Sequence, residues 1–550
     1  MGSYFDDLNW SDELRFNDTQ DAKPIQFTLP LCNPLQHGVG EHLERNVVKA
    51  FSEPPNKTGR TRLGASALRL ALSATFAVSL RAAETIQLVP DEAPGGAVAR
   101  DTQKIQHAID ASHAAGGGAV ELTRGTYVTG TIFLRSNVEL RFAEGATLLG
   151  SSNLADYPEC RPAYRANTDL QVTRSLLYAE KQENMAITGR GRIDFNGGAA
   201  VFQTGKNNDP RRPFGIRFVS CRKIMVRDVT LMNSAQWLQH YLNCDDVTLR
   251  GLTVFNHVNQ NNDGIDIDGS RRVHISDCRV DSDDDGICLK SNGPAPCEDV
   301  LVENCVVSSH CNAIKLGTET TGGFRRIVIR HCQVVPSATG SKHINGVDSS
   351  LSVIALMIVD GGALDDVDIS DLDGSETLSP IFIRLGNRAR LYTDGAPVPG
   401  IGTVRNIRIR NLTAKAAGPT SSHIVGLSHD HRIENVTLEN IRLTSPGGGL
   451  PADLTTIPPA DEKGYPDPGR LGHLPAFGLY ARDVAGLVLK NVSVSLSGED
   501  LRPAFKFDHV DGLTLSGVTG EMHGGNSPMI RLDACDDVDV LPQATSAASR

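Results

Sequence analysis

The sequence predicts an all-β protein in the form of a parallel β-solenoid, and two observations carry this prediction. A motif of the form apolar-x-apolar-x-x-apolar recurs ten times from about residue 185 onwards. In addition, Asp263, Asp285 and Asn312 take the same place in three successive repeats, and an isoleucine follows each of them two positions later. Apolar residues that alternate with period two indicate strands, and repeats of this length without helices stack as coils.

The ten copies of the motif are separated by 23 to 51 residues, and the spacing inside each copy is constant. They are Ile224/Val226/Val229, Val247/Leu249/Leu252, Val273/Ile275/Cys278, Val300/Val302/Cys305, Ile327/Ile329/Cys332, Val367/Ile369/Leu372, Ile407/Ile409/Leu412, Val436/Leu438/Ile441, Leu487/Leu489/Val492 and Leu513/Leu515/Val518. We expect equivalent residues of neighbouring coils to pair about 4.8 Å apart in one sheet. The polar residues Asn243, Asp245, Asp277, Asn304 and Asn411 lie between strands, where they can bond their own backbone at bends.

Composition excludes some functions. The chain has 550 residues and a net charge of −11, so a general nucleic-acid-binding surface is not expected. It has 11 cysteines, of which Cys278, Cys305 and Cys332 recur at 27-residue steps. We interpret these three as a column of small buried side chains. Neither a C-x-x-C pair nor a His/Cys cluster with zinc-ligand spacing is present, so no metal and no cofactor is predicted.

The N-terminal part resembles a misplaced secretion signal. Residues 66–84 contain a short apolar run between basic residues and end in small residues, which is typical of a signal peptide. This segment is far from Met1, so we expect residues 1–65 to be a non-native or disordered leader from a wrongly assigned start. The alternative is an ordinary buried or interfacial helix. The run is interrupted by Arg69 and is short for a membrane span, and we expect no membrane partner.

We expect a single β-helix domain over residues 85–541, followed by an Ala/Ser-rich tail at 542–550. Residues 101–116 predict a capping helix, with Asp101 as the N-cap and three glycines after it. Residues 119–122 and 138–142 alternate as strands do. The apolar helical face is expected to consist of Ile105, Ala108, Ile109 and Ser112.

A long, proline-rich loop is expected from Thr444 to Pro475, because two copies of the motif are 51 residues apart there. Loops of this length on a rigid scaffold often line a binding site. The sequence does not indicate which face of the coils this loop covers.

Three carboxylates are expected to meet on neighbouring coils. Asp263 and Asp285 share a column, and Asp284 is adjacent to Asp285. Gly264 and Gly286 can break the strand alternation and turn the carboxylates outward. Three close carboxylates cannot all ionise at their ordinary pKa, so one should keep its proton near neutral pH. A general acid beside general bases is what glycosidic cleavage requires.

Other polar residues are candidates for sugar contacts. Lys290, Lys315 and Asp268 lie on the same strands, and His240 and Trp237 lie one coil earlier. The lysines can instead neutralise the local charge, and Trp237 can instead belong to the core. An Asp-Asp-Asp run by itself is more often a turn or a calcium site. The register of the carboxylates across coils is what favours a catalytic interpretation.

These motifs resemble glycoside hydrolase family 28, the polygalacturonase-like pectin hydrolases. The residues that carry the resemblance are the early helix with its triple glycine, Gly189-Arg190-Gly191-Arg192-Ile193-Asp194, Trp237-Leu238-Gln239-His240, Asn261-Asn262-Asp263 and Asp284-Asp285. The resemblance implies a right-handed parallel β-helix and hydrolysis with inversion. It also implies that Asp284 is the general acid, that Asp263 and Asp285 hold the water, and that Asn261 contributes to the sugar-binding wall.

Two family motifs are altered here. The family's Gly-His-Gly falls on Cys311-Asn312-Ala313, and its Arg-Ile-Lys, which binds a galacturonate carboxylate, falls on Ala355-Leu356-Met357. Asn312 thus replaces a histidine, and Arg384 on the next coil is the candidate to replace the lost cations. We therefore expect a variant member that acts on a pectic glycan of galacturonan or rhamnogalacturonan type.

The leading hypothesis is a secreted or periplasmic, monomeric, inverting glycoside hydrolase with a polysaccharide or oligosaccharide substrate. A polysaccharide lyase on a similar solenoid is the first alternative, with calcium at residues 283–285 and Arg or Lys as base. A non-catalytic carbohydrate-binding solenoid is the second.

Overall fold

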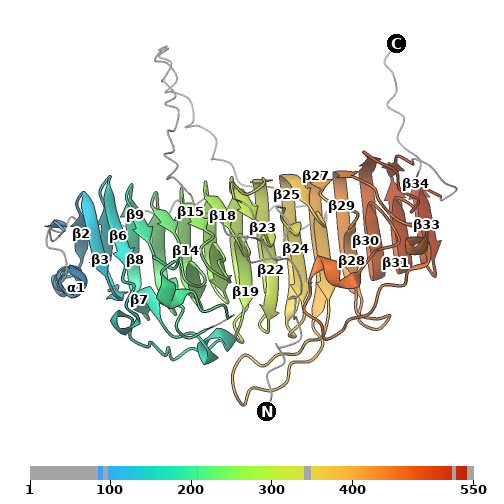
Figure 1. The fold of residues 1–550 in the computed structure, drawn as a ribbon. Helices are drawn as coiled ribbons and strands as arrows, with labels where there is room; N and C mark the ends of the chain where they lie inside the picture. Colours follow the sequence, from blue (N-terminus) through green and yellow to red (C-terminus); the bar gives the residue numbers. More distant parts are fainter. Residues whose placement is uncertain (1–84, 91–96, 207–208, 340–348, 523–527, 542–550) are drawn as a thin grey trace, which may run out of the picture. The chain divides into compact units, whose positions relative to one another are not determined.

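In the computed structural model, three stacks of parallel strands wind around one apolar core (Figure 1). The structure describes residues 85–90, 97–206, 209–339, 349–522 and 528–541. The prediction of a parallel β-helix is confirmed, since every pairing between named strands is parallel and joins one coil to the next.

The first stack, which we call the site sheet, carries the acidic residues. It consists of β4 (Ile132–Phe133), β7 (Ser175–Glu180), β10 (Phe214–Val219), β13 (Gln239–Leu242), β16 (Ile265–Asp268), β19 (Ile287–Ser291), β22 (Asn312–Thr320), β24 (Ser352–Ile358), β26 (Ile381–Leu385), β28 (Ser422–Val425), the first parts of β30 (Leu479–Leu496) and β31 (Phe505–Ser516), and β33 (Ile530–Asp533).

The second stack, the motif sheet, contains the recurring apolar motif. It consists of β1 (Thr85–Leu88), β2 (Gly118–Leu122), β5 (Val138–Phe142), β8 (Glu183–Gly189), β11 (Arg222–Arg227), β14 (Asp245–Arg250), β17 (Arg271–Ser276), β20 (Cys297–Glu303), β23 (Phe324–Val334), β25 (Ala363–Thr377), β27 (Thr403–Ala416), β29 (Ile433–Ser445), later parts of β30 and β31, and β34 (Asp536–Leu541).

The third stack ends earlier in the sequence than the other two. It consists of β3 (Gly125–Thr129), β6 (Ala146–Gly150), β9 (Arg192–Asp194), β12 (Thr230–Met232), β15 (Thr253–Asn256), β18 (Arg279–Ser282), β21 (Val306–Ser309), the last parts of β23, β25, β27, β29 and β30, and β32 (Thr519–Gly520). Short 3-10 turns occur in the loops: η1 (Leu154–Asp156), η2 (Asn167–Leu170), η3 (Ala200–Phe202), η4 (Pro451–Thr455) and η5 (Pro468–Leu471).

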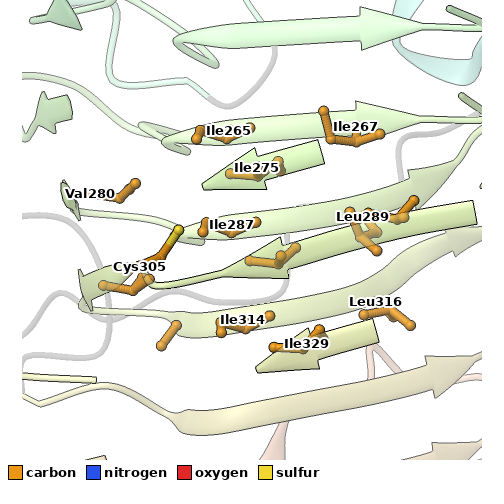
Figure 2. Close-up of a cluster of buried hydrophobic side chains, with 14 of the residues drawn as sticks. Ile265, Ile267, Ile275, Val280, Ile287, Leu289, Cys305, Ile314, Leu316 and Ile329 are labelled. Carbon is orange, nitrogen blue, oxygen red and sulfur yellow. The ribbon is translucent and has the colours of Figure 1, made fainter. Parts of the chain in front are cut away.

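The register follows the motif. Ile224 pairs with Val247, Val247 with Val273, and Val273 with Val300, and the same column continues through all ten copies to Leu513. The paired residues point into the core, where isoleucines and leucines of the site sheet meet those of the motif sheet (Figure 2). Burying such side chains contributes about 1.5–3 kcal/mol each relative to leaving them exposed.

The cysteine column is also confirmed. Cys278, Cys305 and Cys332 are each no more than 2% exposed, and all ten cysteines in the described residues carry free thiols. At the polar bends, Asn243 and Asn411 adopt positive φ, but their side-chain amides donate to side chains of the preceding coil, Ser220 and Asp371, rather than to their own backbone. At one bend the residue differs, because Asp246 rather than Asp245 has the positive φ.

The capping helix α1 (Ala97–Ala114) packs against β2 and β3 at the first coils (Figure 1). Ile105 and Ile109 are fully buried, as predicted, and Gly116 and Gly117 end the helix at positive φ. The predicted start was wrong. The helix begins four residues before Asp101, whose side chain accepts a hydrogen bond from the Val128 backbone instead of capping the helix.

The expected leader at 1–65, the signal-like segment at 66–84 and the tail at 542–550 lie outside the described residues. Among the helices that the structure describes, none has the length and apolar character needed to span a bilayer.

Candidate active site

Four neighbouring strands of the site sheet, β13, β16, β19 and β22, build the candidate site. The pairing of Ile265 with Ile287 and of Ile287 with Ile314 puts Asp263, Asp285 and Asn312 in one column, as predicted. The Gly264 amide donates to the Asp285 carbonyl at 2.9 Å, and the Gly286 amide donates to the Asn312 carbonyl at 2.9 Å. The column therefore extends past the ends of the strands into the turns that carry the carboxylates.

The two glycines have a packing role in this column. A Cβ atom at Gly264 would lie 2.5 Å from a methyl group of Val280, and one at Gly286 would lie 2.5 Å from a methyl group of Val307. The glycines thus occupy the inward position where a side chain would not fit. Asp263 is turned outward and reaches the same lysine as Asp266.

The turn before Asp263 is held by two buried asparagines. Asn256 Nδ2 donates to the Asp263 carbonyl at 3.0 Å. Asn262 Nδ2 donates to the Ser234 carbonyl at 2.8 Å, and Asn262 Oδ1 accepts from the Asn259 amide at 2.6 Å. These bonds satisfy backbone groups of the turn, so the position of Asp263 is defined by the coil before it.

Asp284 and Asp285 differ in exposure. Asp284 is partly exposed, whereas Asp285 is 2% exposed. A carboxylate oxygen of Asp284, one of Asp285 and the Cys311 sulfur lie within 4.8 Å of one another. Burial raises the pKa of the Cys311 thiol well above its ordinary value, which leaves it neutral beside the two carboxyl groups.

The environment separates the two carboxyl groups in acidity. Burial and the charge of Asp285 raise the pKa of Asp284 from 3.8 to about 6. Burial acts in the same direction on Asp285, but Lys315 and Lys290 outweigh it, so the pKa of Asp285 is lowered. Asp285 Oδ2 accepts from Lys315 Nζ at 2.6 Å, and its Oδ1 accepts from Asn312 Nδ2 at 3.0 Å. The pair therefore combines a protonated carboxyl group in mild acid with an ionised carboxylate.

Three carboxyl groups surround Lys290. The ammonium lies 3.4 Å from Asp263, 3.3 Å from Asp266 and 3.6 Å from Glu319, and 4.4 Å from the centre of the Trp237 ring. Burial and the charge of Asp266 raise the pKa of Asp263 well above its ordinary value. Burial raises the pKa of Asp266 to about 8 despite Lys290. One cation thus faces three carboxyl groups, and the raised pKa values of Asp263 and Asp266 favour their protonated forms.

The long loop covers the site sheet. Lys315 Nζ donates to Tyr465 Oη at 3.3 Å, and Arg384 donates to the carbonyls of Ala460 and Asp461. Further along the sheet, Arg482 Nη1 donates to the Pro458 carbonyl at 2.5 Å. The loop therefore lies on the face that carries the carboxylates, the point on which the sequence was silent. Tyr465 remains 47% exposed there.

Two predicted sugar contacts lie below the surface. His240 is fully buried and bonded to Asp268 at 2.9 Å. Trp237 is 6% exposed, packs against Val172 and Phe214, and has Lys290 over its ring. Neither side chain offers a free face for sugar.

The cations predicted to contact sugar also bind protein groups instead. Lys290 and Lys315 are each no more than 3% exposed and neutralise carboxylates, which is the alternative weighed from the sequence. Arg384 is 4% exposed and supports the loop instead of facing solvent. Asn312 positions Asp285, while Asn261 is partly exposed and its Oδ1 lies 3.3 Å from Arg212 Nη1.

The altered family motif at residues 355–357 is apolar in the structure as well. Ala355 and Met357 are fully buried and form a small cluster with Phe382. No cation is present at these positions, and Arg384, which pairs with Met357, is turned to the loop.

Sequence reasoning missed Asp266 and Tyr465. The signal for Asp266 was available, because it alternates with Ile265 and Ile267 and so must face outward. Tyr465 gave no comparable signal, since its position depends on how a loop of over 30 residues folds back.

The Asp-Asp-Asp run does not converge on a single point. Asp283 Oδ1 bonds to His310 at 2.8 Å, whereas Asp285 bonds to Lys315. A calcium site needs several oxygens directed at one ion, and the three adjacent carboxylates are not arranged in this way.

Comparison with known proteins agrees with these features. Residues 159–459 match the model of glycosyl hydrolases family 28. The chain is 28% identical over 290 residues to a probable polygalacturonase from Vitis vinifera, across 49% of this chain and 59% of that protein. It is 23% identical over 311 residues to an exo-poly-alpha-D-galacturonosidase from Dickeya chrysanthemi, across 47% of this chain and 51% of that protein. The matches thus span little more than half of these relatives.

Solved structures support the fold. The crystal structure of a hyperthermoactive exopolygalacturonase from Thermotoga maritima superposes with a TM-score of 0.52 at 22% identity, covering 62% of this chain and 83% of that chain. A polygalacturonase from Erwinia carotovora ssp. carotovora gives 0.51 at 21% identity, covering 66% and 93%. Since the family model extends over more than half of the 550 residues, the chain belongs to glycosyl hydrolases family 28.

Proposed function

We propose that this protein is a secreted or periplasmic glycoside hydrolase that cleaves glycosidic bonds in a pectic polysaccharide or oligosaccharide with inversion at the anomeric carbon. One observation carries the proposal: Asp284 and Asp285 are adjacent, but only Asp284 has a raised pKa, of about 6. Hydrolysis of this kind needs one carboxylic acid and one carboxylate at the same bond.

Asp284 is the proposed general acid. It is the partly exposed member of the group, and protonation of the leaving oxygen requires contact with the substrate. Asp285 is the proposed base that activates water, because Lys315 and Asn312 keep it ionised and oriented. Asp263 would assist Asp285, and Asp266 would hold the proton that the Asp263–Asp266 pair shares.

A pectic substrate is proposed from the family and from the names of the relatives, which are polygalacturonases. The apolar cluster at Ala355, Met357 and Phe382 argues against the usual carboxylate contact at that position. We therefore propose a glycan of galacturonan or rhamnogalacturonan type, and of the two a rhamnogalacturonan offers a neutral sugar for this subsite. Asn261, which is partly exposed, and Tyr465, which is 47% exposed, are the proposed sugar contacts, since aromatic faces stack on apolar faces of sugar rings.

The test is to incubate the purified protein with defined galacturonan and rhamnogalacturonan oligosaccharides and identify the products by mass spectrometry. The masses of the two products should add up to the mass of the substrate plus one water. The Asp284→Asn variant should not form these products. Proton NMR of the first products should show the inverted anomer. Absence of any product from either glycan class would reject the proposed substrate class, and a retained anomer would reject inversion.

The same assay separates the alternatives. A lyase would release an unsaturated, ultraviolet-absorbing sugar without adding water. A non-catalytic binding protein would retain the oligosaccharides without changing their mass, and mutation of Asp284 would not alter the binding. We also propose a monomer, which analytical ultracentrifugation would check.

A further inference from the structure

A second column of polar side chains lies beside the candidate active site. His257, Asp283 and His310 each follow a strand of the third stack directly, and they are 26 and 27 residues apart. Asn256 pairs with Ser282, and Ser282 pairs with Ser309, so the three residues occupy one position on three successive coils. They are 4%, 1% and 0% exposed.

The outer nitrogens of both imidazoles are already held. His257 Nε2 lies 2.8 Å from Asp281 Oδ1, and His310 Nε2 lies 2.9 Å from the Thr339 carbonyl oxygen. A carbonyl and a carboxylate only accept hydrogen bonds, so each Nε2 carries the hydrogen. In a neutral imidazole the other nitrogen, Nδ1, then presents a lone pair.

Both Nδ1 atoms point to the same carboxylate. His310 Nδ1 lies 2.8 Å from Asp283 Oδ1, and His257 Nδ1 lies 3.8 Å from the same oxygen. One ligand atom from each of the three residues lies within 4.8 Å of the other two. If both imidazoles are neutral, two lone pairs and a carboxylate oxygen converge in a place that excludes bulk water, where they repel unless a positive charge lies among them.

We propose that His257, Asp283 and His310 bind a divalent transition-metal ion, with Zn²⁺ as the best match. Two imidazole nitrogens and one carboxylate oxygen form a common zinc donor set, and imidazole disfavours Ca²⁺ or Mg²⁺. The ion's charge of +2 is balanced by Asp283 and Asp281. Thr339 Oγ1, which is 3.3 Å from His257 Nδ1, or a water molecule completes the tetrahedron.

The surroundings match those of a metal-ligating histidine. Such a histidine usually gives its second N–H to a carboxylate or a backbone carbonyl, and here Asp281 and Thr339 supply one of each. Ser337 in turn donates to Asp281 Oδ1 at 2.6 Å. The inference does not depend on the proposed hydrolase activity, and the metal would fix the backbone at Asp283, directly before Asp284.

The competing occupant is a proton. If both imidazoles are protonated, they form two ion pairs with Asp281 and Asp283, and the charge also balances. A bound metal can be measured by elemental analysis and replaced by Co²⁺, which absorbs visible light, whereas protons give neither signal. The test therefore uses metal content and Co²⁺ absorption.

The experiment uses the full chain. After purification and dialysis against metal-free buffer, elemental analysis should find about one equivalent of zinc per chain. After chelation, added Co²⁺ should produce the visible absorption of a tetrahedral site, and added Zn²⁺ should abolish that absorption and raise the melting temperature. The Asp283→Asn and His310→Gln variants should lose the stoichiometric zinc and the cobalt spectrum.

The matched control is His274→Gln. His274 also bonds to a carboxylate, Glu303 at 2.9 Å, but its side chain is 41% exposed on the motif sheet. This variant should keep the metal content of the wild type. Wild-type protein that retains no metal and shows no cobalt spectrum would overturn the proposal in favour of shared protons, even if both site variants fail to fold. Equal metal content in wild type and a folded Asp283→Asn variant would overturn it as well.

Discussion

The pKa of Asp284 makes the sharpest prediction about activity. With a pKa of about 6, the carboxyl group is about 90% protonated at pH 5, whereas at its ordinary value of 3.8 it would be about 6% protonated. The environment thus increases the acid form about 15-fold at this pH. We expect kcat/KM on a pectic oligosaccharide to fall above about pH 6, with one proton lost.

The Asp284→Asn variant removes the proton donor while keeping the acceptor for the Asp285 amide, which binds Asp284 Oδ1 at 2.9 Å. We expect kcat to fall by about 10²-fold or more, because general acid help is lost. The matched control is Asp277→Asn, the same chemical change on an exposed bend one coil earlier than Asn304. It should retain wild-type turnover.

Stability provides an independent check on the same group. The folded pKa of Asp284 lies above its unfolded value, so the folded state holds the extra proton between about pH 4 and pH 6. The free energy of unfolding therefore decreases as pH rises through this window, by about 3 kcal/mol for a change from 3.8 to about 6. The Asp284→Asn variant lacks this ionisation and should be more stable than wild type at pH 7 but not at pH 4.

Urea denaturation at pH 4 and pH 7 measures the difference in stability between wild type and variant. Oligosaccharide hydrolysis across pH 4–8 measures how kcat/KM falls above about pH 6. Near wild-type turnover by the Asp284→Asn variant would refute the assignment. A loss of activity above about pH 6 that is the same in the residual activity of this variant as in wild type would refute it as well. A variant with equal stability differences at both pH values would refute the burial argument.

Three further predictions concern the surroundings of the site. Lys315→Met leaves Asp285 buried without its cation, so we expect a loss of about 3–5 kcal/mol in urea denaturation, whereas Lys490→Met, which breaks an exposed pair with Glu439, should cost about 1 kcal/mol or less. If Lys315→Met still folds, the acidic limb of its activity should move to higher pH, because the pKa of Asp285 is no longer lowered; an unmoved limb would contradict the role given to Asp285. Tyr465→Ala should raise KM for oligosaccharides more than Tyr465→Phe, which keeps the ring and loses only the 3.3 Å contact with Lys315; equal KM values for the two variants would count against stacking. Arg384→Met removes the donors to the Ala460 and Asp461 carbonyls, so the loop should be cleaved faster in limited proteolysis than in the exposed control Arg408→Met, and unchanged cleavage would show that the loop is held by other contacts.

Much of the fold could be predicted because a solenoid repeats one local rule. The motif Val273/Ile275/Cys278 recurs with constant internal spacing, and parallel pairing of neighbouring coils then follows from burial of the same side chains. Even the column of Asp263, Asp285 and Asn312 could be read in this way. The helix start was missed because Asp101 lies inside the helix, where its side chain accepts a hydrogen bond from the strand residue Val128.

What the sequence by itself determined was the stacking of coils and the column that holds Asp263 and Asp285, since both depend on residues at regular intervals along the chain. Only the tertiary structure decided which polar groups remain accessible. Lys290, His240 and Arg384 are bound to neighbouring groups of the protein. Tyr465 contacts Lys315 although it lies about 150 residues further along the chain. The physical reason is that periodic strand pairing is local from coil to coil, whereas the path of a long loop and the charges it covers depend on contacts that no spacing in the sequence encodes.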